Sequence, residues 1–426
     1  MKRTLLQSVI LIAVIGFVYR HAPGAYFFED DFQWLASRAF FHPTQIFNLD
    51  LFDHFYRPVV ELYFWAGVRW FDGSPTVMHV SIVMLHMINA ILLMAFGRRI
   101  SGNIRYGFHA ALFFAVMPGY VEAIAWVGAL AEAVGAFFGM SAIYCWLEFR
   151  RAGGPWRATA AAVLYAAALL THESSVVFIA MTGLADLAFG TAWADMRSPR
   201  RWPRLVRDYL PFVLLTLAYL WIDITINTRS YLVDEGHYRL GWHAVPNILS
   251  YIASLYVGER TPVFYAITSI VVVMLLVRGT PRVRFATAWM LIAILPFAFF
   301  TWGNTSRYQY LPAIGFAMLL SEGVEWLARV LEGRVPNRAR LTIVAVVAAV
   351  ITIRFMAFAS EAVENFARRT EMWRGFGQAI RAEYPQVPPG GEVVISRALA
   401  EKHGRLYLEG LVRWEYRDPT IRVSLR

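Results

Sequence analysis

Residues 75–96 read PTVMHVSIVMLHMINAILLMAF and contain no aspartate, glutamate, lysine or arginine. A helix needs about 20 predominantly apolar residues to cross the hydrocarbon core of a bilayer, and this run reaches that length. Its apolar residues are continuous, whereas a strand of a membrane β-barrel alternates apolar and polar residues. The run therefore predicts a membrane-spanning helix.

The same pattern recurs along the rest of the chain. Of the 426 residues, 58% are hydrophobic and 16% are charged, whereas soluble globular proteins have roughly 25% charged residues. With a mean hydropathy of +0.46, this composition excludes a soluble enzyme and a disordered protein. Further apolar runs cover residues 4–19, 106–120, 133–149, 158–170, 174–189, 209–226, 262–277, 285–301, 311–327 and 341–359. We predict an all-α fold, a polytopic membrane bundle of about eleven transmembrane helices.

The basic residues indicate how the chain is oriented in the membrane. The net charge is +10, and arginines gather in short connections between apolar runs, at residues 98–105, 148–157, 194–208, 277–284 and 328–340. Cytoplasmic loops carry such an excess of basic residues. We therefore place these loops and the N-terminus in the cytoplasm, and we expect no nucleic-acid partner. Segments 20–74 and 227–261 then become extracytoplasmic loops of a transmembrane domain, residues 1–359, and residues 360–426 become a small extracytoplasmic tail.

Smaller features complete this prediction. Lys2 precedes the first run, which lacks a small-residue cleavage site and is expected to remain as an uncleaved helix. Segment 58–71 is aromatic and apolar with two charges, which fits a helix lying in the membrane interface. The tail contains a strand-like EVVIS at residues 392–396. The single cysteine, Cys145, excludes an intrachain disulfide and a cysteine-based zinc site. Nearly all basic residues are arginines, which we interpret as a bacterial composition and hence a bacterial plasma-membrane location.

The first extracytoplasmic loop carries three consecutive acids. Glu29, Asp30 and Asp31 stand between aromatic residues in FFEDDFQW, residues 27–34. Adjacent carboxylates repel one another, which raises one pKa unless a cation lies nearby. Asp30 and Asp31 therefore suit a general base or a divalent-metal site, with Mg²⁺ or Mn²⁺ as the candidate ions. The alternative is a solvated acidic turn.

Other polar residues at or near the apolar runs are candidates for substrate binding. Arg57 precedes Pro58 in extended backbone, where it could bind a phosphate, pair with the acids or anchor the interface. His86 and Asn89 share one face of the run 75–96, where they could line a cavity or hydrogen-bond to other helices. The remaining candidates at run ends are Glu122, Glu173, Arg307 and Tyr308. Glu132 and His172 stand beside them at the same run ends, without an assigned role.

Most of these candidates map to the same side of the membrane. The acids, Arg57, Glu122, Glu173 and Arg307 all fall in connections that the arginine pattern places outside the cytoplasm. A transporter should instead place its polar groups near the membrane midplane, on broken helices. This arrangement favours an enzyme that acts at the outer leaflet.

The order of these motifs resembles that of a known superfamily. An acidic pair, YRP at Tyr56–Pro58, a histidine with asparagine, a P-x-x-x-E turn from Pro118 to Glu122 and RYQYLP from Arg307 follow one another. This order is similar to the GT-C superfamily of polyprenyl-phosphate-sugar-dependent glycosyltransferases. The resemblance is strongest to the membrane part of the transmembrane and tetratricopeptide-repeat O-mannosyltransferases and their bacterial relatives, and it covers roughly residues 26–315.

The resemblance implies a function and also shows departures. It implies transfer of a sugar from a polyprenyl-phosphate carrier in the membrane to a hydroxyl acceptor of a protein, glycan or lipid, with Asp30 as the likelier base of the pair. The family's Gly-Arg-Ala-Asp is replaced by residues 129–132, which end in Glu132, and its Lys-Glu by His172-Glu173. Both departures remove a cation that could hold the donor phosphate, and the tetratricopeptide repeats are missing from this sequence. A transporter or flippase of lipid-linked sugars and a non-catalytic scaffold remain as alternatives.

Overall fold

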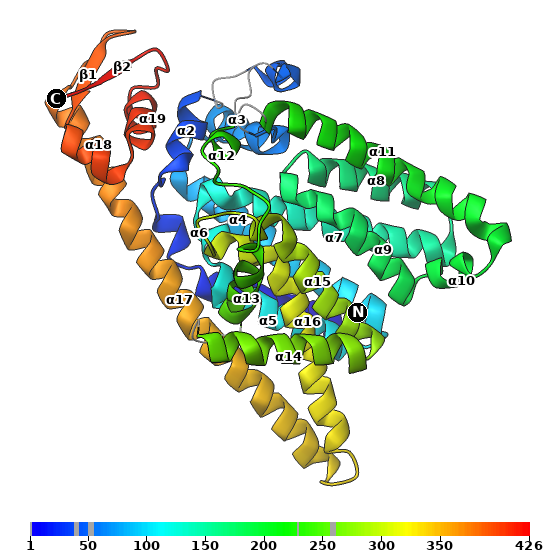
Figure 1. Ribbon diagram of the computed structural model, residues 1–426. Coiled ribbons are helices and arrows are strands. Elements are labelled where there is room, and N and C mark those ends of the chain that lie inside the picture. Colours follow the sequence, from blue (N-terminus) through cyan, green and yellow to red (C-terminus); the bar gives the residue numbers. More distant parts are fainter. Residues whose placement is uncertain (1, 38–41, 50–54, 228–229, 256–260) are drawn as a thin grey trace.

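The computed structural model describes residues 2–37, 42–49, 55–227, 230–255 and 261–426, and Figure 1 shows their arrangement. Each predicted apolar run forms a helix. These helices are α1 (Lys2–Val18), α4 (Pro75–Ser101), α5 (Ile104–Val116), α7 (Leu130–Ala152), α8 (Pro155–Leu169), α9 (Val177–Phe189), α11 (Trp202–Asn227), α14 (Pro262–Arg278), α15 (Pro281–Ala298), α16 (Tyr310–Val330) and α17 (Asn337–Glu383). The prediction of a polytopic helical bundle is confirmed.

The helices differ in their capacity to cross a membrane. Within the described ranges, six are long and apolar enough to span, in the segments Pro75–Ser101, Val127–Ala152, Pro199–Ile226, Pro281–Ala298, Ser306–Val330 and Asn337–Glu383. Helices such as α5 and α9 are shorter than the predicted runs because the chain turns at one end. After α5, for example, Pro118 opens a 3-10 turn, η5 (Pro118–Tyr120). The number of complete spans thus stays a prediction.

Short helices and turns connect these long helices. The α-helical ones are α2 (Asp30–Ser37), α3 (Pro58–Phe71), α6 (Glu122–Ala125), α10 (Ala192–Met196), α12 (Tyr231–Asp234), α13 (Ala244–Leu255), α18 (Arg397–His403) and α19 (Arg405–Glu415). The 3-10 turns are η1 (Ala22–Gly24), η3 (Pro43–Phe47), η5, η6 (Val127–Ala129), η7 (Glu173–Val176), η8 (Pro199–Arg201) and η9 (Ser306–Gln309). Helix α3 coincides with the predicted segment 58–71, because Pro58 can start a helix and Asp72 ends it in the left-handed region.

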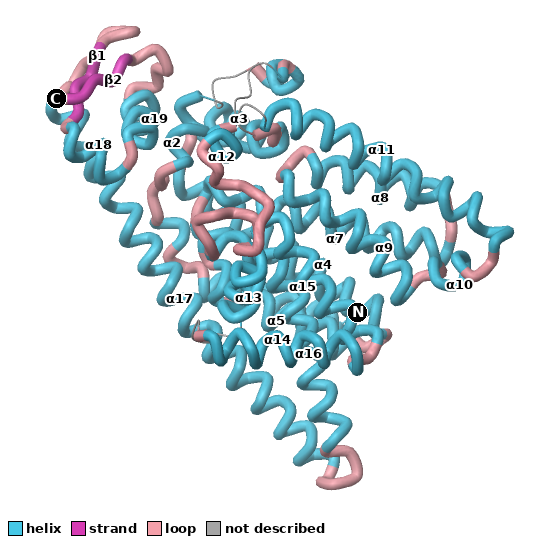
Figure 2. The backbone as a smooth tube through the Cα atoms, in the orientation of Figure 1, coloured by secondary structure: helices cyan, strands magenta, loops and turns pink. Residues whose placement is uncertain are grey.

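The C-terminal segment contains the strand that the sequence predicts. Strands β1 (Glu392–Ile395) and β2 (Arg422–Leu425) pair in parallel, with Val393 opposite Val423, and Figure 2 shows them at the tip of the molecule. The predicted domain boundary at residues 359 and 360 lies inside α17, which continues unbroken for 47 residues. At 1.5 Å per residue, this helix is about 70 Å long. It therefore links the bundle directly to the tail.

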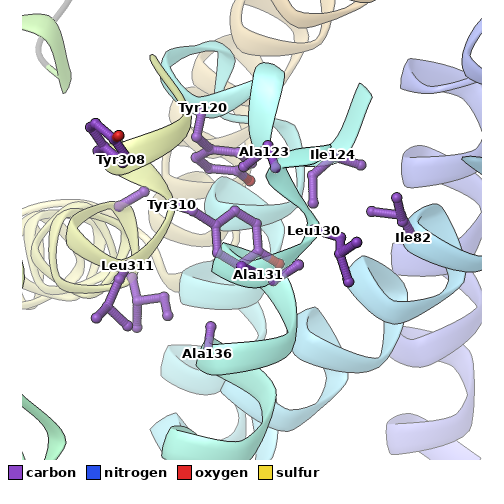
Figure 3. Close-up of a cluster of buried hydrophobic side chains, with 14 of the residues drawn as sticks. Ile82, Tyr120, Ala123, Ile124, Leu130, Ala131, Ala136, Tyr308, Tyr310 and Leu311 are labelled. Carbon is purple, nitrogen blue, oxygen red and sulfur yellow. The ribbon is translucent and has the colours of Figure 1, made fainter. Parts of the chain in front are cut away.

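The bundle is closed by aromatic and small side chains. Tyr120 and Tyr310 pack edge to face with their ring centroids 4.9 Å apart, and Figure 3 shows them among buried alanine, leucine and isoleucine side chains. Where α4 meets α5, a Cβ atom on Gly107 would lie 2.3 Å from the Met94 carbonyl oxygen. A glycine is needed there because no side chain fits between the two helix backbones.

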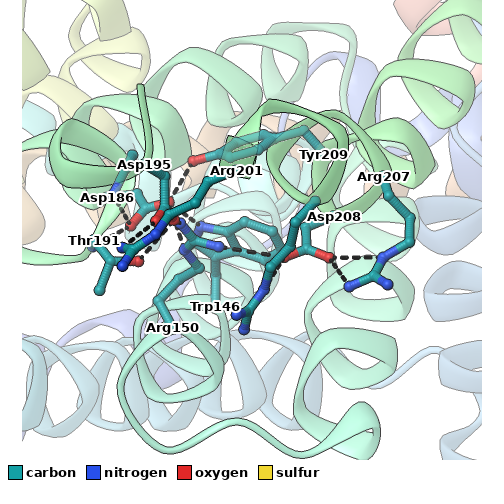
Figure 4. Close-up of polar contacts among 11 residues, drawn as sticks. Trp146, Arg150, Asp186, Thr191, Asp195, Arg201, Arg207, Asp208 and Tyr209 are labelled. Carbon is teal, nitrogen blue, oxygen red and sulfur yellow. Dashed lines mark hydrogen bonds and ion pairs between the residues drawn. The ribbon is translucent and has the colours of Figure 1, made fainter. Parts of the chain in front are cut away.

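A buried ionic cluster joins α7, α9, α10 and α11 (Figure 4). Arg150 Nε lies 2.9 Å from Asp186 Oδ2, and its Nη1 lies 3.3 Å from Asp208 Oδ2. The guanidinium also pairs with Asp195, and the Tyr209 hydroxyl donates to Asp186 over 2.9 Å. Only 2% of the Arg150 side chain is exposed. This cluster compensates one buried cation with three carboxylates from three different elements.

Loss of Arg150 should therefore destabilise the fold. Breaking a buried ion pair by removing one partner costs about 3 to 5 kcal/mol, so we expect Arg150→Met to lower the thermal unfolding temperature of the detergent-solubilised protein strongly. The neighbouring Arg151 is a matched control, because its side chain is 64% exposed. Arg151→Met should change the unfolding free energy by less than about 0.5 kcal/mol. Equal stability of both variants would show that the cluster carries no net stabilisation.

The two ends of the chain lie on opposite sides of the bundle. The N-terminus and the turn between α16 and α17 lie toward the lower part of Figure 1, whereas α2, α3, α12 and the C-terminus lie toward the upper part. The arginine pattern predicts a cytoplasmic N-terminus and an extracytoplasmic C-terminus. A periplasm-dependent reporter fused after Arg426 should be active and a cytoplasm-dependent one inactive. The reverse result would reverse the predicted orientation.

Candidate active site

A cavity of about 430 Å³ opens at the upper end of the bundle and gathers most of the predicted site residues. Five of them line it: Asp30, Arg57, Glu173, Arg307 and Tyr308. They come from the start of α2, the residue before α3, and the turns η7 and η9. The structure therefore brings residues from distant connections of the chain together at one cavity.

The acidic pair diverges at the start of α2. Glu29 has a φ of +43°, in the left-handed region, and the helix begins at the next residue. Asp30 lines the cavity. Asp31 has no exposed surface, and its Oδ2 accepts a hydrogen bond of 2.8 Å from the Phe28 backbone N–H. The two carboxylates thus have different surroundings, and only Asp30 can meet a substrate in the cavity.

The surroundings of Asp30 and Asp31 raise the pKa of both carboxyl groups. Burial raises the pKa of Asp30, while the charges of Arg307 and Arg57 and a hydrogen bond from Tyr407 oppose that rise. Burial raises the pKa of Asp31 well above its usual value, against the opposing hydrogen bond from Phe28. An acid whose pKa is raised toward the working pH is a better proton acceptor for an alcohol than an ordinary carboxylate. Asp30 combines that property with access to the cavity.

Arg57 is held by a carboxylate of the cavity wall. Its Nε donates to Glu173 Oε2 over 2.9 Å and its Nη2 to Glu173 Oε1 over 2.6 Å. The guanidinium also lies 4.1 Å from the centroid of the Phe55 ring. Burial disfavours the ionised form of Glu173, yet the Arg57 charge lowers the pKa of this acid to about 2. The pair therefore stays ionised, and Glu173 has a partner within the protein.

Arg307 has a different environment. Its guanidinium lies 4.9 Å from the Trp126 ring centroid and 4.8 Å from that of Tyr308, and its Nη2 is 3.4 Å from the Tyr308 hydroxyl. Among the residues that the structure describes, no carboxylate lies within 4.0 Å of its guanidinium nitrogens. A cation flanked by aromatic faces and without an acidic partner can bind an anion. Arg307 is therefore the better candidate of the two arginines for a phosphate.

Two lining residues were noted in the sequence without a role in the site. Glu132 and His172 both line the cavity, and His172 Nε2 lies 3.5 Å from Glu132 Oε1. The Ser174 backbone N–H donates to His172 Nδ1 over 3.1 Å, so the proton of the neutral ring is on Nε2. Burial lowers the pKa of His172 to about 3, which keeps this ring neutral. In the sequence, Glu132 and His172 could be noticed only because they depart from the family pattern at these positions.

The cavity wall also contains aromatic rings that the sequence analysis did not select. Phe300 and Trp302 stack with their centroids 4.4 Å apart, and both line the cavity with Tyr308. The Tyr308 ring stacks in turn on Phe297 at 4.1 Å. Aromatic residues are too frequent in this chain for such a set to be recognised before the chain is folded, because they make up 15% of it.

Four predicted site residues do not line the cavity: Asp31, His86, Asn89 and Glu122. His86 Nδ1 lies 2.9 Å from the Tyr310 hydroxyl, and Asn89 Nδ2 donates to the Ala133 carbonyl over 2.8 Å. Both side chains have no exposed surface. In the structure His86 and Asn89 hydrogen-bond between helices, which was the alternative that the sequence left open. Glu122 begins the short helix α6, and its charge acts on Arg307.

The acidic pair does not fit the predicted divalent-metal site. Asp31 is turned into the protein while Asp30 faces the cavity, so the two carboxylates do not converge. Across the described ranges, no group of three or more histidine, cysteine, aspartate or glutamate residues is arranged to hold a metal ion. We therefore derive no step through a metal.

Comparisons with known proteins identify the fold. No family model and no curated protein sequence matches this chain. The structure is similar to ArnT from Cupriavidus metallidurans bound to undecaprenyl phosphate, with a TM-score of 0.53 and 14% identity over 98% of this chain and 89% of that one. The apo state of the same protein gives a TM-score of 0.50 with 14% identity, over 98% and 88% of the two chains. An oligosaccharyltransferase from Archaeoglobus fulgidus, in complex with zinc and sulfate, gives 0.49 with 13% identity, over 94% and 57%.

The similarity to the two ArnT structures shows the fold of this chain. This chain has the same fold as ArnT over nearly its whole length. The predicted polytopic membrane architecture is confirmed by the same comparison. At 14% identity the similarity defines the fold alone. The reaction depends on the residues that line the cavity.

The Arg57–Glu173 pair makes a pH-dependent contribution to stability. The folded-state pKa of Glu173 is about 2, below its ordinary value of 4.5, so its stabilisation is present above pH 4.5 and is lost as the pH falls toward 2. We expect Glu173→Gln to lower the unfolding free energy at pH 7 by about 1 to 3 kcal/mol, since 26% of this side chain is exposed.

The difference between wild type and Glu173→Gln should shrink below pH 4.5 in chemical denaturation of the detergent-solubilised protein. Glu235 serves as a control, because it pairs with a histidine and its side chain is 63% exposed. Glu235→Gln should behave as wild type throughout. A difference for Glu173→Gln that is the same at pH 3 and pH 7 would contradict the assigned ion pair.

Proposed function

We propose that the protein is an integral membrane glycosyltransferase that moves a sugar from a polyprenyl-phosphate carrier to a hydroxyl acceptor. One observation carries this proposal: the Asp30 carboxylate and the Arg307 cation, which has no acidic partner among the described residues, line the same cavity. A sugar transfer of this kind needs both groups. It needs a base for the acceptor hydroxyl and a cation for the departing phosphate.

Arg307 is the proposed phosphate-binding residue. When the bond between the anomeric carbon and the phosphate oxygen breaks, negative charge grows on the leaving lipid phosphate. The rings of Trp126 and Tyr308 lie against the Arg307 guanidinium, and its N–H groups can donate hydrogen bonds to that oxygen. Arg57, a second candidate from the sequence, is already neutralised by Glu173 and is assigned a supporting role in the cavity wall.

Asp30 is the proposed general base. The acceptor hydroxyl gives its proton to the Asp30 carboxylate as its oxygen forms a bond to the anomeric carbon, and the bond from that carbon to the phosphate oxygen breaks. The products are a glycoside, a polyprenyl phosphate and a protonated Asp30, which then releases its proton to water. The aromatic rings of Phe300, Trp302 and Tyr308 provide apolar faces for the sugar ring in the same cavity.

The partners and the location follow from this proposal. ArnT was solved with undecaprenyl phosphate bound, which supports a polyprenyl-phosphate carrier as the lipid partner of the same fold. The arginine pattern supports an extracytoplasmic position for the cavity, and the proposed location is a bacterial plasma membrane. The acceptor would then be a protein, glycan or lipid hydroxyl on that side. The alternative is a transporter of lipid-linked sugars. If the protein were such a transporter, turnover of the labelled carrier would not need Asp30.

The catalytic assignment can be tested by replacing Asp30. Asp30→Asn keeps the shape of the side chain but removes the proton acceptor, and general-base catalysis contributes about 10²- to 10⁴-fold. We expect loss of label from radiolabelled undecaprenyl-phosphate-linked sugars, tested as a panel in proteoliposomes with native membrane extract as acceptor source, to fall by at least about two orders of magnitude. The variant should remain folded and membrane-inserted.

Asp72 provides a matched control in the same extracytoplasmic loop. Its side chain is 98% exposed, so Asp72→Asn changes the same charge away from the cavity. This control should convert the donor at the wild-type rate. Wild-type conversion by Asp30→Asn as well would show that Asp30 is not the base.

A further inference from the structure

Two polar side chains of the cavity wall have no role in the reaction proposed above. Glu132 lies in the first turn of α7, and His172 directly precedes the turn η7. Both line the cavity, yet they are only 6% and 4% exposed. Burying a polar group costs free energy unless the group is hydrogen-bonded. The hydrogen-bond partners of these two side chains are therefore the question.

Glu132 has a carboxylate oxygen without a hydrogen-bond partner in the protein. Its Oε1 is buried and accepts no hydrogen bond from the residues that the structure describes. Among those residues, His172 provides the only basic group within 4.0 Å of the carboxylate, with its Nε2 at 3.5 Å. That separation exceeds the length of about 2.7 to 3.2 Å of an ordinary N–H···O hydrogen bond. This oxygen therefore keeps its capacity to accept a hydrogen bond.

His172 offers a donor next to this acceptor. Its Nδ1 accepts from the Ser174 backbone N–H over 3.1 Å, and the Ser174 hydroxyl lies 2.7 Å from the same nitrogen. Nε2 therefore carries the proton of the neutral ring. Nε2 lies 3.8 Å from Glu173 Oε1, and that carboxylate is already bound to Arg57. The cavity wall thus presents one donor and one acceptor that the described residues do not satisfy.

The pair adjoins the part of the cavity assigned to the donor phosphate. The His172 ring lies 6.1 Å from the ring of Phe297, which stacks on Tyr308 at 4.1 Å. Tyr308 in turn lies against the Arg307 guanidinium. Because the sugar is bonded to the phosphate, its ring has to lie in the cavity near this wall. The acceptor, by contrast, needs to bring only one hydroxyl to Asp30.

The chemistry of the pair selects hydroxyl groups. Glu132 Oε1 requires a hydrogen-bond donor, and His172 Nε2 requires an acceptor. An ammonium group can only donate and an ionised phosphate oxygen can only accept, whereas hydroxyl groups do both. Two hydroxyl oxygens on adjacent carbons of a sugar ring have a separation similar to that of the two protein atoms. A sugar diol can therefore satisfy both.

We propose that Glu132 and His172 form a recognition site for two neighbouring hydroxyl groups of the transferred sugar, in which one hydroxyl donates to Glu132 Oε1 and the other accepts from His172 Nε2–H. This inference rests on the glycosyltransferase function proposed above, and it narrows the donor to a sugar with two such hydroxyls. A sugar without one of them would leave a buried polar group of the protein unpaired, which is how a site strongly rejects an analogue.

Equilibrium binding to the full-length protein in nanodiscs tests the recognition site. The probes are bare undecaprenyl phosphate, its glucose, mannose, galactose and xylose derivatives, and the monodeoxy analogues of the sugar that binds most tightly. We expect the wild type to bind that derivative at least about 10-fold more tightly than the bare carrier, because a hydrogen bond to a charged group contributes about that factor. Equal affinities for the bare carrier and all four derivatives would overturn the proposal.

The monodeoxy analogues identify the hydroxyls that the wild type binds. Removal of two hydroxyls, adjacent on the ring, should weaken binding, one by about 10-fold and the other by about 5-fold, because the second bond joins neutral groups. Losses at positions that are not adjacent, or at none, would overturn the proposal. The second of these results would mean that the two side chains bind only water.

Two variants assign each hydroxyl to its protein partner. Glu132→Met keeps the length of the side chain and removes the acceptor, whereas His172→Asn removes Nε2–H but can still cap η7. The first deoxygenation should no longer weaken binding in Glu132→Met, and the second should no longer weaken it in His172→Asn. Wild-type affinity for the bare carrier would show that both variants are folded. Deoxygenations that weaken binding equally in the wild type and in both folded variants would overturn the proposal.

A second glutamate–histidine pair provides the matched controls. Glu235 Oε2 and His237 Nε2 lie 2.9 Å apart, and this exposed pair is not part of the cavity wall. Glu235→Met and His237→Asn should therefore keep all wild-type affinities. Because binding needs no turnover, the assigned hydroxyls without sugar transfer would retain the recognition site and reject the glycosyltransferase function. Transfer without any such assignment would retain the function and reject the recognition site.

Discussion

The ion pair between Arg57 and Glu173 connects the segment before α3 to the bundle, and the geometry of the cavity depends on it. Two hydrogen bonds of 2.9 and 2.6 Å join the residue before α3 to the turn between α8 and α9. Beside them, the Val59 backbone N–H donates to the Leu170 carbonyl over 3.2 Å. Because this pair satisfies Arg57 internally, the cavity retains Arg307 as the cation for an anionic ligand. Two arginines that look equivalent in the sequence thus have different chemical roles.

Helix α2 is positioned by a hydrogen bond within its own segment and, on both sides, by elements that are distant in the sequence. On the bundle side, Asp31 accepts a hydrogen bond from the Phe28 backbone, and the Trp126 indole N–H donates to the Phe28 carbonyl over 3.0 Å. On the other side, α19 covers α2 at Gly410. Asp30 therefore lies between the membrane bundle and the C-terminal segment. An acceptor that approaches from outside would meet both parts of the protein at once.

The sequence predicted the helices and the meeting of the cavity residues for definite physical reasons. Apolar runs without charges have to become helices in a membrane, because every backbone polar group must be satisfied internally. The arginine pattern assigned the connections to sides, so Asp30, Arg57, Glu173 and Arg307 could be expected near one another. The extent of α17 was harder to predict, because the end of an apolar run does not end a helix. No proline occurs between Asn337 and Glu383, and the helix continues into polar sequence.

Roles that depend on side-chain partners could not be predicted in the same way. His86 and Asn89 share one face of α4, and that face would be the same for a substrate contact and for a helix contact. The partner that decides, Tyr310, is 224 residues from His86. His172 likewise approaches Glu132 only after the turn η7 has packed against α7. In each case the information lies in a long-range contact, which no local pattern contains.

The most direct test of the account is the position of a lipid phosphate in the cavity. An electron cryo-microscopy structure of the protein in nanodiscs containing undecaprenyl phosphate should show phosphate density about 2.7 to 3.2 Å from the Arg307 guanidinium, facing Asp30 across the cavity, with the Arg57–Glu173 pair intact. Phosphate density outside the cavity, or bound to Arg57 after separation of that pair, would contradict the assigned roles of the two arginines.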